Sequence, residues 1–161
     1  MFQPMRRFKQ ELNQKEIEEI LQRNTAGTLA LLGDDGYPYS VPISYVYDNG
    51  ALYFHCAKTG HKIDAIRNCS KASFSVIDQD VIVPERFTTH FKSVIAFGKI
   101  TIVEDPKELE EALRAIGTKY GTGDAQDLEQ EVQKTLSIVC ILRMDIEHMT
   151  GKQAKELVPQ K

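Results

Sequence analysis

Two tight turns enclose one alternating segment, and this arrangement constrains the fold more than any other part of the sequence. Asp35-Gly36 and Asp48-Asn49-Gly50 are both typical of β-hairpin turns. Between them, residues 37–47 place aromatic or aliphatic side chains at every second position, as a strand with one buried face does. Apolar stretches at 25–32 and 51–56 flank the two turns. The sequence therefore predicts three consecutive strands joined as a meander.

The middle strand of this meander carries two prolines on the same face, Pro38 and Pro42. Proline cannot donate a backbone hydrogen bond, so in sheets it is confined to edge strands and bulges. We expect this strand to lie at an edge of the sheet or to be interrupted. Either arrangement leaves main-chain groups without a partner in the sheet, and a ligand can bind them.

Helices are predicted where a capping residue precedes apolar residues at helical spacing, and further strands where apolar residues alternate. The first helix has the clearest signal, because Asn13 and Glu16 form a capping-box pattern. Helices are expected at residues 13–22, 60–68, 105–120 and 124–134, and further strands at 71–77, 91–103 and 135–146. Gly98, inside the strand at 91–103, indicates a bulge or a close backbone approach.

The order of these elements decides the fold class. Strands do not alternate with helices and no G-x-G-x-x-G motif is present, which disfavours a Rossmann sheet. We predict a single domain over residues 1–161, mainly β with added helices, in which six strands form an antiparallel barrel. Residues 1–10 are expected to form an N-terminal arm, 78–90 a flexible loop and 151–161 a polar C-terminal tail.

Composition narrows the classes of partner and the cellular compartment. The net charge of −3 offers no basic face to duplex nucleic acid, and no apolar run approaches the roughly 18 residues that cross a bilayer. Residues 1–10 are not followed by the apolar segment of a secretory signal. The three cysteines show no C-x-x-C spacing, which excludes common zinc motifs and a disulfide framework. We expect reduced thiols, a cytoplasmic protein, and neither nucleic acid nor membrane as a partner.

A basic loop at residues 58–62 is the candidate site. It follows the third predicted strand and leads into the helix at 60–68, where free N–H groups and the helix dipole favour an anion. A solvated turn is the alternative reading of the loop by itself. Together with the exposed backbone of the proline-containing strand, the loop suits a phosphorylated planar cofactor. Cys56 adjoins the loop, where basic side chains favour a thiolate.

Other chemistry finds little support in the sequence. There is no G-x-S-x-G, H-E-x-x-H or Walker motif, and no metal site is predicted, since His55 and His61 are six residues apart across a strand end. The segment Met5-Arg6-Arg7 is open to two readings, a solvated tail or an arm that binds a cofactor or phosphate.

Five segments, which extend over about residues 5–152, carry a family resemblance. They are Met5-Arg6-Arg7, 41–45, 52–66, 93–100 and 148–152. The sequence of 52–66 is the most specific of them. The segments look like the Nim branch, related to nitroimidazole resistance, of the pyridoxamine 5'-phosphate oxidase-like flavin proteins. The resemblance implies an FMN-binding split β-barrel and a homodimer with FMN at the subunit interface.

The resemblance also implies a set of site residues. Those expected to contact or approach the cofactor are Val41, Pro42, Ile43, Ser44, His55, Cys56, Ala57, Lys58, Gly60, His61, Lys62, Ser93 and Val94. Lys58, His61 and Lys62 would hold the phosphate, and the backbone of 41–44 would run along the isoalloxazine ring. His55 is the candidate catalytic residue, as a proton donor to the substrate.

The implied function is that of an FMN-dependent oxidoreductase that reduces a small molecule such as a nitroaromatic or nitroimidazole. FAD is an alternative cofactor, and a nicotinamide nucleotide is a candidate electron donor. Two alternatives remain: a flavin-binding or redox-sensing module without turnover, and a relative that binds haem or a deazaflavin. Pyridoxamine phosphate oxidase activity is less expected, because Gly151-Lys152-Gln153 stands where a substrate-binding arginine motif would be sought.

Overall fold

The computed structural model describes residues 2–33 and 35–159. These residues form seven antiparallel strands and four α-helices, with loops between them. Met1, Asp34 in the first predicted turn, and residues 160–161 of the predicted tail lie outside this description. The strands are β1 (Ala26–Leu32), β2 (Pro38–Ser44), β3 (Val46–Asp48), β4 (Ala51–Cys56), β5 (Lys71–Val83), β6 (Thr88–Ile102) and β7 (Cys140–Gln153). The helices are α1 (Gln14–Arg23), α2 (His61–Asn68), α3 (Pro106–Tyr120) and α4 (Ala125–Thr135), with short 3₁₀ helices η1 (Phe8–Gln10), η2 (Pro84–Arg86) and η3 (Lys155–Leu157).

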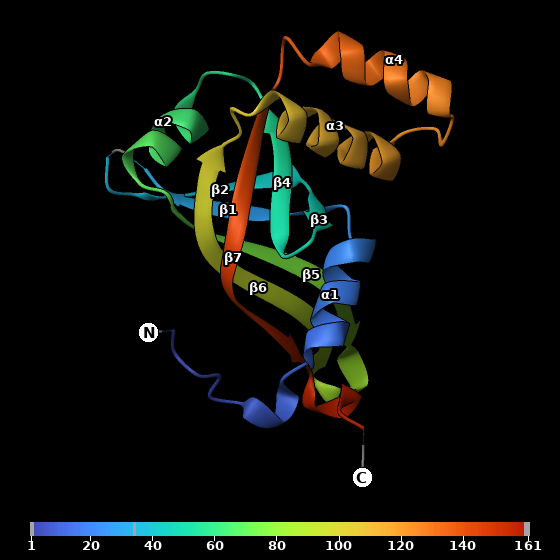
Figure 1. Cartoon of the computed structure of the whole chain (residues 1–161). Coiled ribbons are helices and arrows are strands. Elements are labelled where there is room, and N and C mark those ends of the chain that lie inside the picture. Colours follow the sequence, from blue (N-terminus) through green and yellow to red (C-terminus); the bar gives the residue numbers. More distant parts are fainter. Residues whose placement is uncertain (1, 34, 160–161) are drawn as a thin grey trace.

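The strands form one curved sheet in the order β2-β1-β5-β6-β7-β4-β3. The sheet curls until β2, at one edge, contacts β4 near the other edge (Figure 1). Its concave side holds the main core, in which Phe54, Phe74 and Leu142 are fully buried. A second core lies between the outer side of the sheet and the α3–α4 pair. The predicted mainly β barrel with added helices is confirmed.

The sheet has seven strands rather than the predicted six, because the proline-containing segment breaks at Tyr45. β2 pairs with β1, whereas β3 pairs with β4, so the two halves belong to opposite edges of the sheet. The Tyr45 N–H donates to the Tyr120 hydroxyl oxygen at 3.0 Å, and that hydroxyl donates to the Tyr45 carbonyl at 2.7 Å. The expectation of an edge position and an interruption is therefore confirmed.

Local signals located the helices correctly. Asn13 and Glu16 form the predicted capping box at α1, and the side chains of Asp105 and Asp124 cap α3 and α4. The α2 helix differs, because no side chain caps its N-terminus. No helix in the described part of the chain is long and apolar enough to cross a lipid bilayer.

Residues 78–90 do not form the predicted loop. They extend β5 and β6 into a long hairpin that η2 closes, with Phe87 in the left-handed region at φ +48°. The polar composition reflects the exposure of this hairpin rather than an irregular backbone. A register shift between Ile77 and Gln79 leaves Asp78 beside Arg23, whose guanidinium contacts its carboxylate and anchors the end of α1.

The last strand begins and ends later than predicted. Residues 136–139 form a turn that covers the second core, and β7 runs from Cys140 to Gln153 beside β6. Most of the predicted tail therefore belongs to regular secondary structure, the end of β7 and η3. Gly151 packs closely against α1 and the residues just before it, so that an added Cβ would be 2.9 Å from Leu12 Cβ. Gln153 and Ala154 are buried, and the Ala154 N–H donates to the Phe91 carbonyl at 2.9 Å.

Candidate functional site

The basic loop forms a cavity of about 180 Å³ between the end of β4 and the start of α2. Strand β4 ends at Cys56, and Gly60 turns the chain into α2 with φ +123°, a conformation that L side chains rarely adopt. No atom lies within 4 Å of the place where a Gly60 Cβ would stand. The cavity is lined by Tyr39, Cys56, Ala57, Thr59, Gly60, His61, Lys62 and Ile63.

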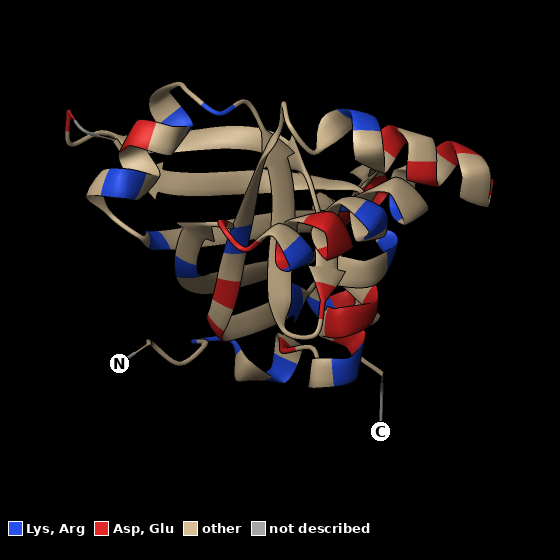
Figure 2. Cartoon of the chain, turned by 45° about the horizontal axis from the view of Figure 1, so that its top comes forward, with Lys and Arg blue, Asp and Glu red and all other residues tan. Residues whose placement is uncertain are grey.

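The first turn of α2 supplies the anion-binding character of this cavity. Backbone N–H groups at a helix start carry a partial positive charge, and no side chain caps those of α2. Lys62 adds a full charge at the cavity wall. Figure 2 shows Lys and Arg on α2 and the loop before it, beside the acidic Asp64 in the first turn of the helix, and many acidic residues on α1, α3 and α4. We call the cavity with the start of α2 the phosphate cradle, after the anion that it suits.

Two ring systems join the phosphate cradle to the edge strand. The Tyr39 ring, on β2, stacks on the His61 ring, on α2, with centroids 4.3 Å apart and an interplanar angle of 27°. The contact holds the outer edge of the sheet beside the cradle. Tyr39 was absent from the predicted site, although its position two residues before Val41 places both on one face of the strand.

Strand β2 presents its backbone at the edge of the sheet. Val41 and Ile43 pack against the main core, whereas Pro42 and Ser44 are exposed. In an antiparallel pair, alternate residues direct their N–H and C=O toward the partner strand, and the residues between them direct these groups away from it. Pro42 has no N–H to donate to β1, so Pro42 and the residues two positions before and after it belong to the set that faces away. The predicted segment 41–44 therefore offers free main-chain groups next to the cradle.

Lys58 lies apart from the other basic residues of the loop. Its Nζ donates a hydrogen bond to the Ser137 carbonyl in the turn before β7, and its side chain does not line the cradle. The cation therefore ties the loop to that turn. Lys62 and the start of α2 provide the charge at the cavity itself.

His55 and Cys56 face opposite sides of β4, since successive residues of a strand alternate. Cys56 lines the cradle, whereas His55 is exposed and lines a cavity of about 130 Å³ formed with α3 and α4. One ligand held within one chain's cradle does not meet both side chains. Their arrangement differs in this respect from the predicted site.

The expected thiolate at Cys56 is contradicted. Burial, and after it the neighbouring Cys140 thiol, raise the pKa of Cys56 to about 11, because Lys62 opposes them only in part. Cys140 stands directly opposite Cys56 in the β4–β7 ladder. The adjacent basic loop is therefore outweighed, and Cys56 is a neutral thiol at neutral pH.

Ser93 and Val94 lie on β6, away from the cradle. Val94 is fully buried in the main core, and its backbone is paired with β5 on one side and β7 on the other. Ser93 points to the other face, together with Ile95 and Phe97. The fold therefore makes Val94 a core residue and leaves Ser93 on an outer face.

Residues 119 and 120, at the end of α3, contact Tyr45 at the break between β2 and β3. Besides the Tyr120 hydrogen bonds at the β2–β3 break, the Lys119 ammonium lies 4.3 Å from the Tyr45 ring centroid and donates to the Asn24 carbonyl. Burial lowers the pKa of Lys119. No local sequence signal links residues 75 positions apart, so these contacts could not have been inferred from the pattern. In residues 2–33 and 35–159, no three or more His, Cys, Asp and Glu side chains are grouped to hold a metal ion.

Comparisons with solved structures find the same fold in proteins of low sequence identity. A conserved hypothetical protein from Mycobacterium tuberculosis is 21% identical with a TM-score of 0.82, over 98% of this chain and 96% of that chain. A proposed 5-nitroimidazole antibiotic resistance protein from Bacteroides thetaiotaomicron is 22% identical with a TM-score of 0.76, over 89% and 86%. An FAD and haem binding protein from Mycobacterium smegmatis is 19% identical with a TM-score of 0.78, over 95% and 77%.

Sequence comparison identifies the family. A search of curated proteins gives no significant match. The family profile described as pyridoxamine 5'-phosphate oxidase matches residues 13–153, which include every strand and all four α-helices. The chain therefore belongs to the pyridoxamine 5'-phosphate oxidase family, and its fold is the split barrel of the relatives described above.

Proposed function

We propose that this protein is an FMN-binding oxidoreductase that reduces a small nitroaromatic such as a nitroimidazole. The observation that carries the proposal is the phosphate cradle, an uncapped helix start with Lys62 beside the free edge of β2. Family membership and the FAD-binding protein among the structural relatives support a flavin as the ligand.

The residues of the cradle fit the phosphate end of FMN. Lys62 and the backbone N–H groups at the start of α2 would hold the phosphate, and Gly60 leaves room for it because no side chain occupies its outer side. The outward backbone groups of Ser40 and Ser44 would address the polar edge of the flavin ring. Lys58 would serve mainly to fix the loop through Ser137.

The chain's own residues bind, orient and protonate. When bound, FMN supplies the electron transfer to the substrate. The Cys56 thiol stays neutral, so it lines the cradle as a small side chain and does not act as a nucleophile. His55 is the proposed proton donor. Because it is exposed on the face of β4 opposite the cradle, this role requires a substrate held at the flavin of a second copy of the chain.

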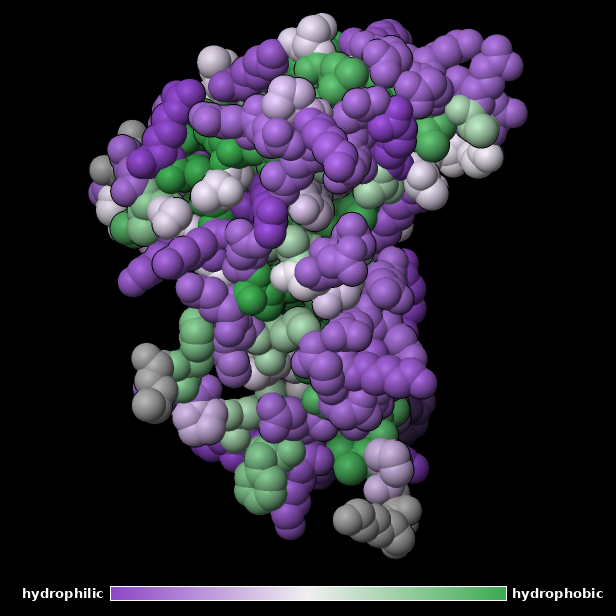
Figure 3. Space-filling view, in the orientation of Figure 1, coloured by the Kyte–Doolittle hydropathy of each residue, from purple (hydrophilic) through white to green (hydrophobic). Residues whose placement is uncertain are grey.

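A homodimer is part of the proposal. Ser93 shares the outer face of β6 with Ile95 and Phe97, whose side chains are 42% and 36% exposed. In Figure 3, hydrophobic residues reach the surface in the middle of the view, where Figure 1 shows β6 and β7. A second copy on this face would cover these side chains and would bring Ser93 toward the partner's flavin.

The first test measures flavin binding. The purified protein should show the absorbance of bound flavin, and Lys62→Ala should weaken FMN binding at least tenfold, about 1.4 kcal/mol, because a charge-assisted contact is lost. Lys58→Ala is the matched control and should bind FMN within about threefold of the wild type. Equal retention by Lys62→Ala would place the phosphate elsewhere, and a Soret band would support the haem alternative.

The second test measures turnover. FMN-loaded protein should be reduced anaerobically by a nicotinamide nucleotide, and addition of a 5-nitroimidazole should restore the oxidised absorbance. His55→Gln should slow this reoxidation about 10²-fold without loss of FMN, since general acid catalysis typically contributes that much. If no nitro compound restores the absorbance, the protein is a flavin-binding module without this activity.

A further inference from the structure

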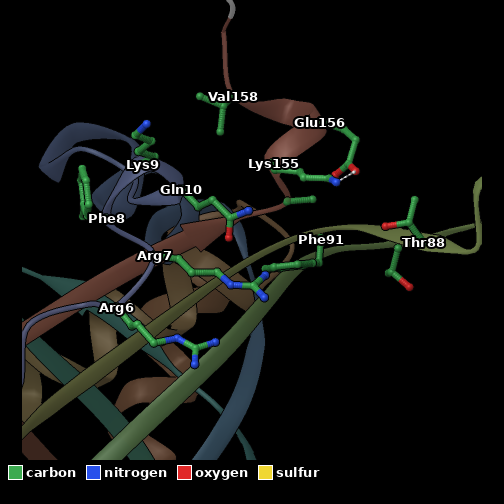
Figure 4. A pocket seen from close by; sticks show the side chains of 12 residues that line it. Arg6, Arg7, Phe8, Lys9, Gln10, Thr88, Phe91, Lys155, Glu156 and Val158 are labelled. Atoms are coloured by element: carbon green, nitrogen blue, oxygen red, sulfur yellow. Dashed lines mark ion pairs between the residues drawn. The ribbon is translucent and has the colours of Figure 1, made fainter.

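A second and larger cavity lies at the other end of the barrel from the phosphate cradle. Its volume is about 780 Å³, within the range of about 300–1,000 Å³ that small-molecule sites occupy. The N-terminal arm forms one wall, the start of β6 another, and the segment around η3 the third (Figures 1 and 4). The Arg6-Arg7 pair, for which the sequence left two readings, therefore lines a cavity in which the N-terminal and C-terminal segments of the described chain meet.

The lining of this cavity is strongly cationic in a protein of net charge −3. Arg6, Arg7, Lys9 and Lys155 line it, and the acid among the lining residues, Glu156, is paired with Lys155 at 3.8 Å. Within the part of the chain that the structure describes, the side chains of Arg6 and Arg7 have no hydrogen bond or ion pair. Figure 4 shows both side chains extending on the same side of the arm, with that of Arg7 directed toward Phe91. Two guanidinium groups without a partner suit a carboxylate or phosphate.

A buried polar atom points to a more specific ligand than a simple ion. Gln10 is only 8% exposed, lines the cavity, and its Oε1 has no hydrogen-bond partner. Leaving such an acceptor unpaired costs about 1–3 kcal/mol. A ligand with a hydrogen-bond donor would satisfy it. The arm that carries Gln10 is fixed, since the Gln10 N–H donates to the Arg7 carbonyl and the Leu12 N–H to the Gly151 carbonyl, both at 2.9 Å.

Apolar surface completes the cavity. Phe91, Ala154 and Val158 line it, and Thr88 and Thr89 add hydroxyl groups. The Phe91 ring has the Lys152 ammonium 5.3 Å from its centroid, so one face is engaged with a cation. The cavity thus combines an anion-binding end, an aromatic wall and a buried acceptor.

We propose that this cavity is a second ligand site, distinct from the phosphate cradle, for a small aromatic anion that carries a hydrogen-bond donor. The carboxylate or phosphate binds Arg6 and Arg7, the ring packs against Phe91, and the donor faces Gln10. Inorganic phosphate meets only the first of these requirements and binds more weakly.

The test is a set of titrations into the ¹⁵N-labelled full chain, with and without saturating FMN. The probes are 4-aminobenzoate, benzoate without the donor, aniline without the anion, and inorganic phosphate; 4-aminophenyl phosphate shows which anion the site prefers. 4-Aminobenzoate should shift the backbone amides of residues 6–10 and 88–91 saturably, and bind at least tenfold more tightly than aniline or phosphate. Addition of FMN should leave these shifts in place.

Two variants separate the site from nonspecific charge attraction. Arg6→Gln with Arg7→Gln should weaken 4-aminobenzoate at least tenfold, whereas Lys107→Gln, an exposed lysine on α3, should not. Gln10→Leu should abolish the preference for 4-aminobenzoate over benzoate, with an unchanged amide spectrum elsewhere as evidence of folding. Shifts confined to residues 57–63, equal binding by the double variant, or displacement of the probe by FMN would each overturn the proposal.

Discussion

At the scale of single residues, Cys56 shows how burial decides chemistry. Sequence context places it beside a basic loop, which favours a thiolate, yet desolvation and the opposing Cys140 raise its pKa to about 11. Lys62 lowers that pKa too little to restore the anion. The sequence shows which basic residues adjoin Cys56, but it does not show the burial, whose effect on the pKa is larger than theirs.

This pKa yields a prediction for Cys56 reactivity. Because the thiolate is the nucleophile, alkylation of Cys56 by iodoacetamide at pH 7.5 should be about 100-fold slower or more than that of an unperturbed cysteine. The rate should rise with pH through a midpoint near pH 11. Peptide mass spectrometry of the native protein over a pH series measures it, with urea-unfolded protein as the control. Rapid labelling that levels off near pH 8.5 would contradict the assigned pKa.

Single residues were predictable where their partners are close in sequence. The reciprocal hydrogen bonds of Asn13 and Glu16 span three positions, and their spacing predicts them. The contacts of Lys58 with Ser137 and of Tyr120 with Tyr45 join residues 79 and 75 positions apart. Such contacts depend on how α3, α4 and the sheet pack, which no local pattern specifies.

At the scale of elements, helices followed their local signals whereas strands depended on their partners. The β5–β6 hairpin was misread as a loop because its outer half has no fully buried side chain on either face, so the apolar alternation disappears. The end of β7 was misread as a tail for a similar reason, since pairing with β6 extends it to Gln153. The bulge at Gly98 was predictable, because a glycine inside a strand commonly marks a bulge or a close approach of another backbone.

The close packing at Gly98 gives a prediction about stability. A Cβ at this position would lie 2.0 Å from the Asp145 carbonyl oxygen, a backbone atom that cannot move without disturbing β7. Gly98→Ala should therefore lower the free energy of unfolding by about 1–3 kcal/mol or more. Urea denaturation measures the change, with Thr101→Ala, exposed on the same strand, as the matched control. A loss no greater than that of the control would show that β6 and β7 can separate freely here.

At the scale of the whole molecule, the residues that the family resemblance groups together are distributed over two surfaces. Lys62, Cys56 and the edge of β2 meet at the cradle, whereas Ser93 lies on the outer face of β6. The sequence pattern predicted each segment but could not say which faces of the barrel they occupy. In the proposed homodimer, a second copy of the chain would present its Ser93 face to the first copy's cradle and so bring the two sets together.

The last prediction tests this assembly. Ile95 is exposed on the outer face of β6, so Ile95→Asp should place a charge in the proposed interface and convert the dimer to a monomer. Light scattering coupled to size-exclusion chromatography measures the mass. Ile138→Asp is the matched control, because Ile138 is also exposed but lies in the turn before β7, and it should remain dimeric. FMN should be lost together with the dimer if Ser93 acts across the interface. A monomeric wild type that retains FMN would show instead that one chain's cradle is sufficient.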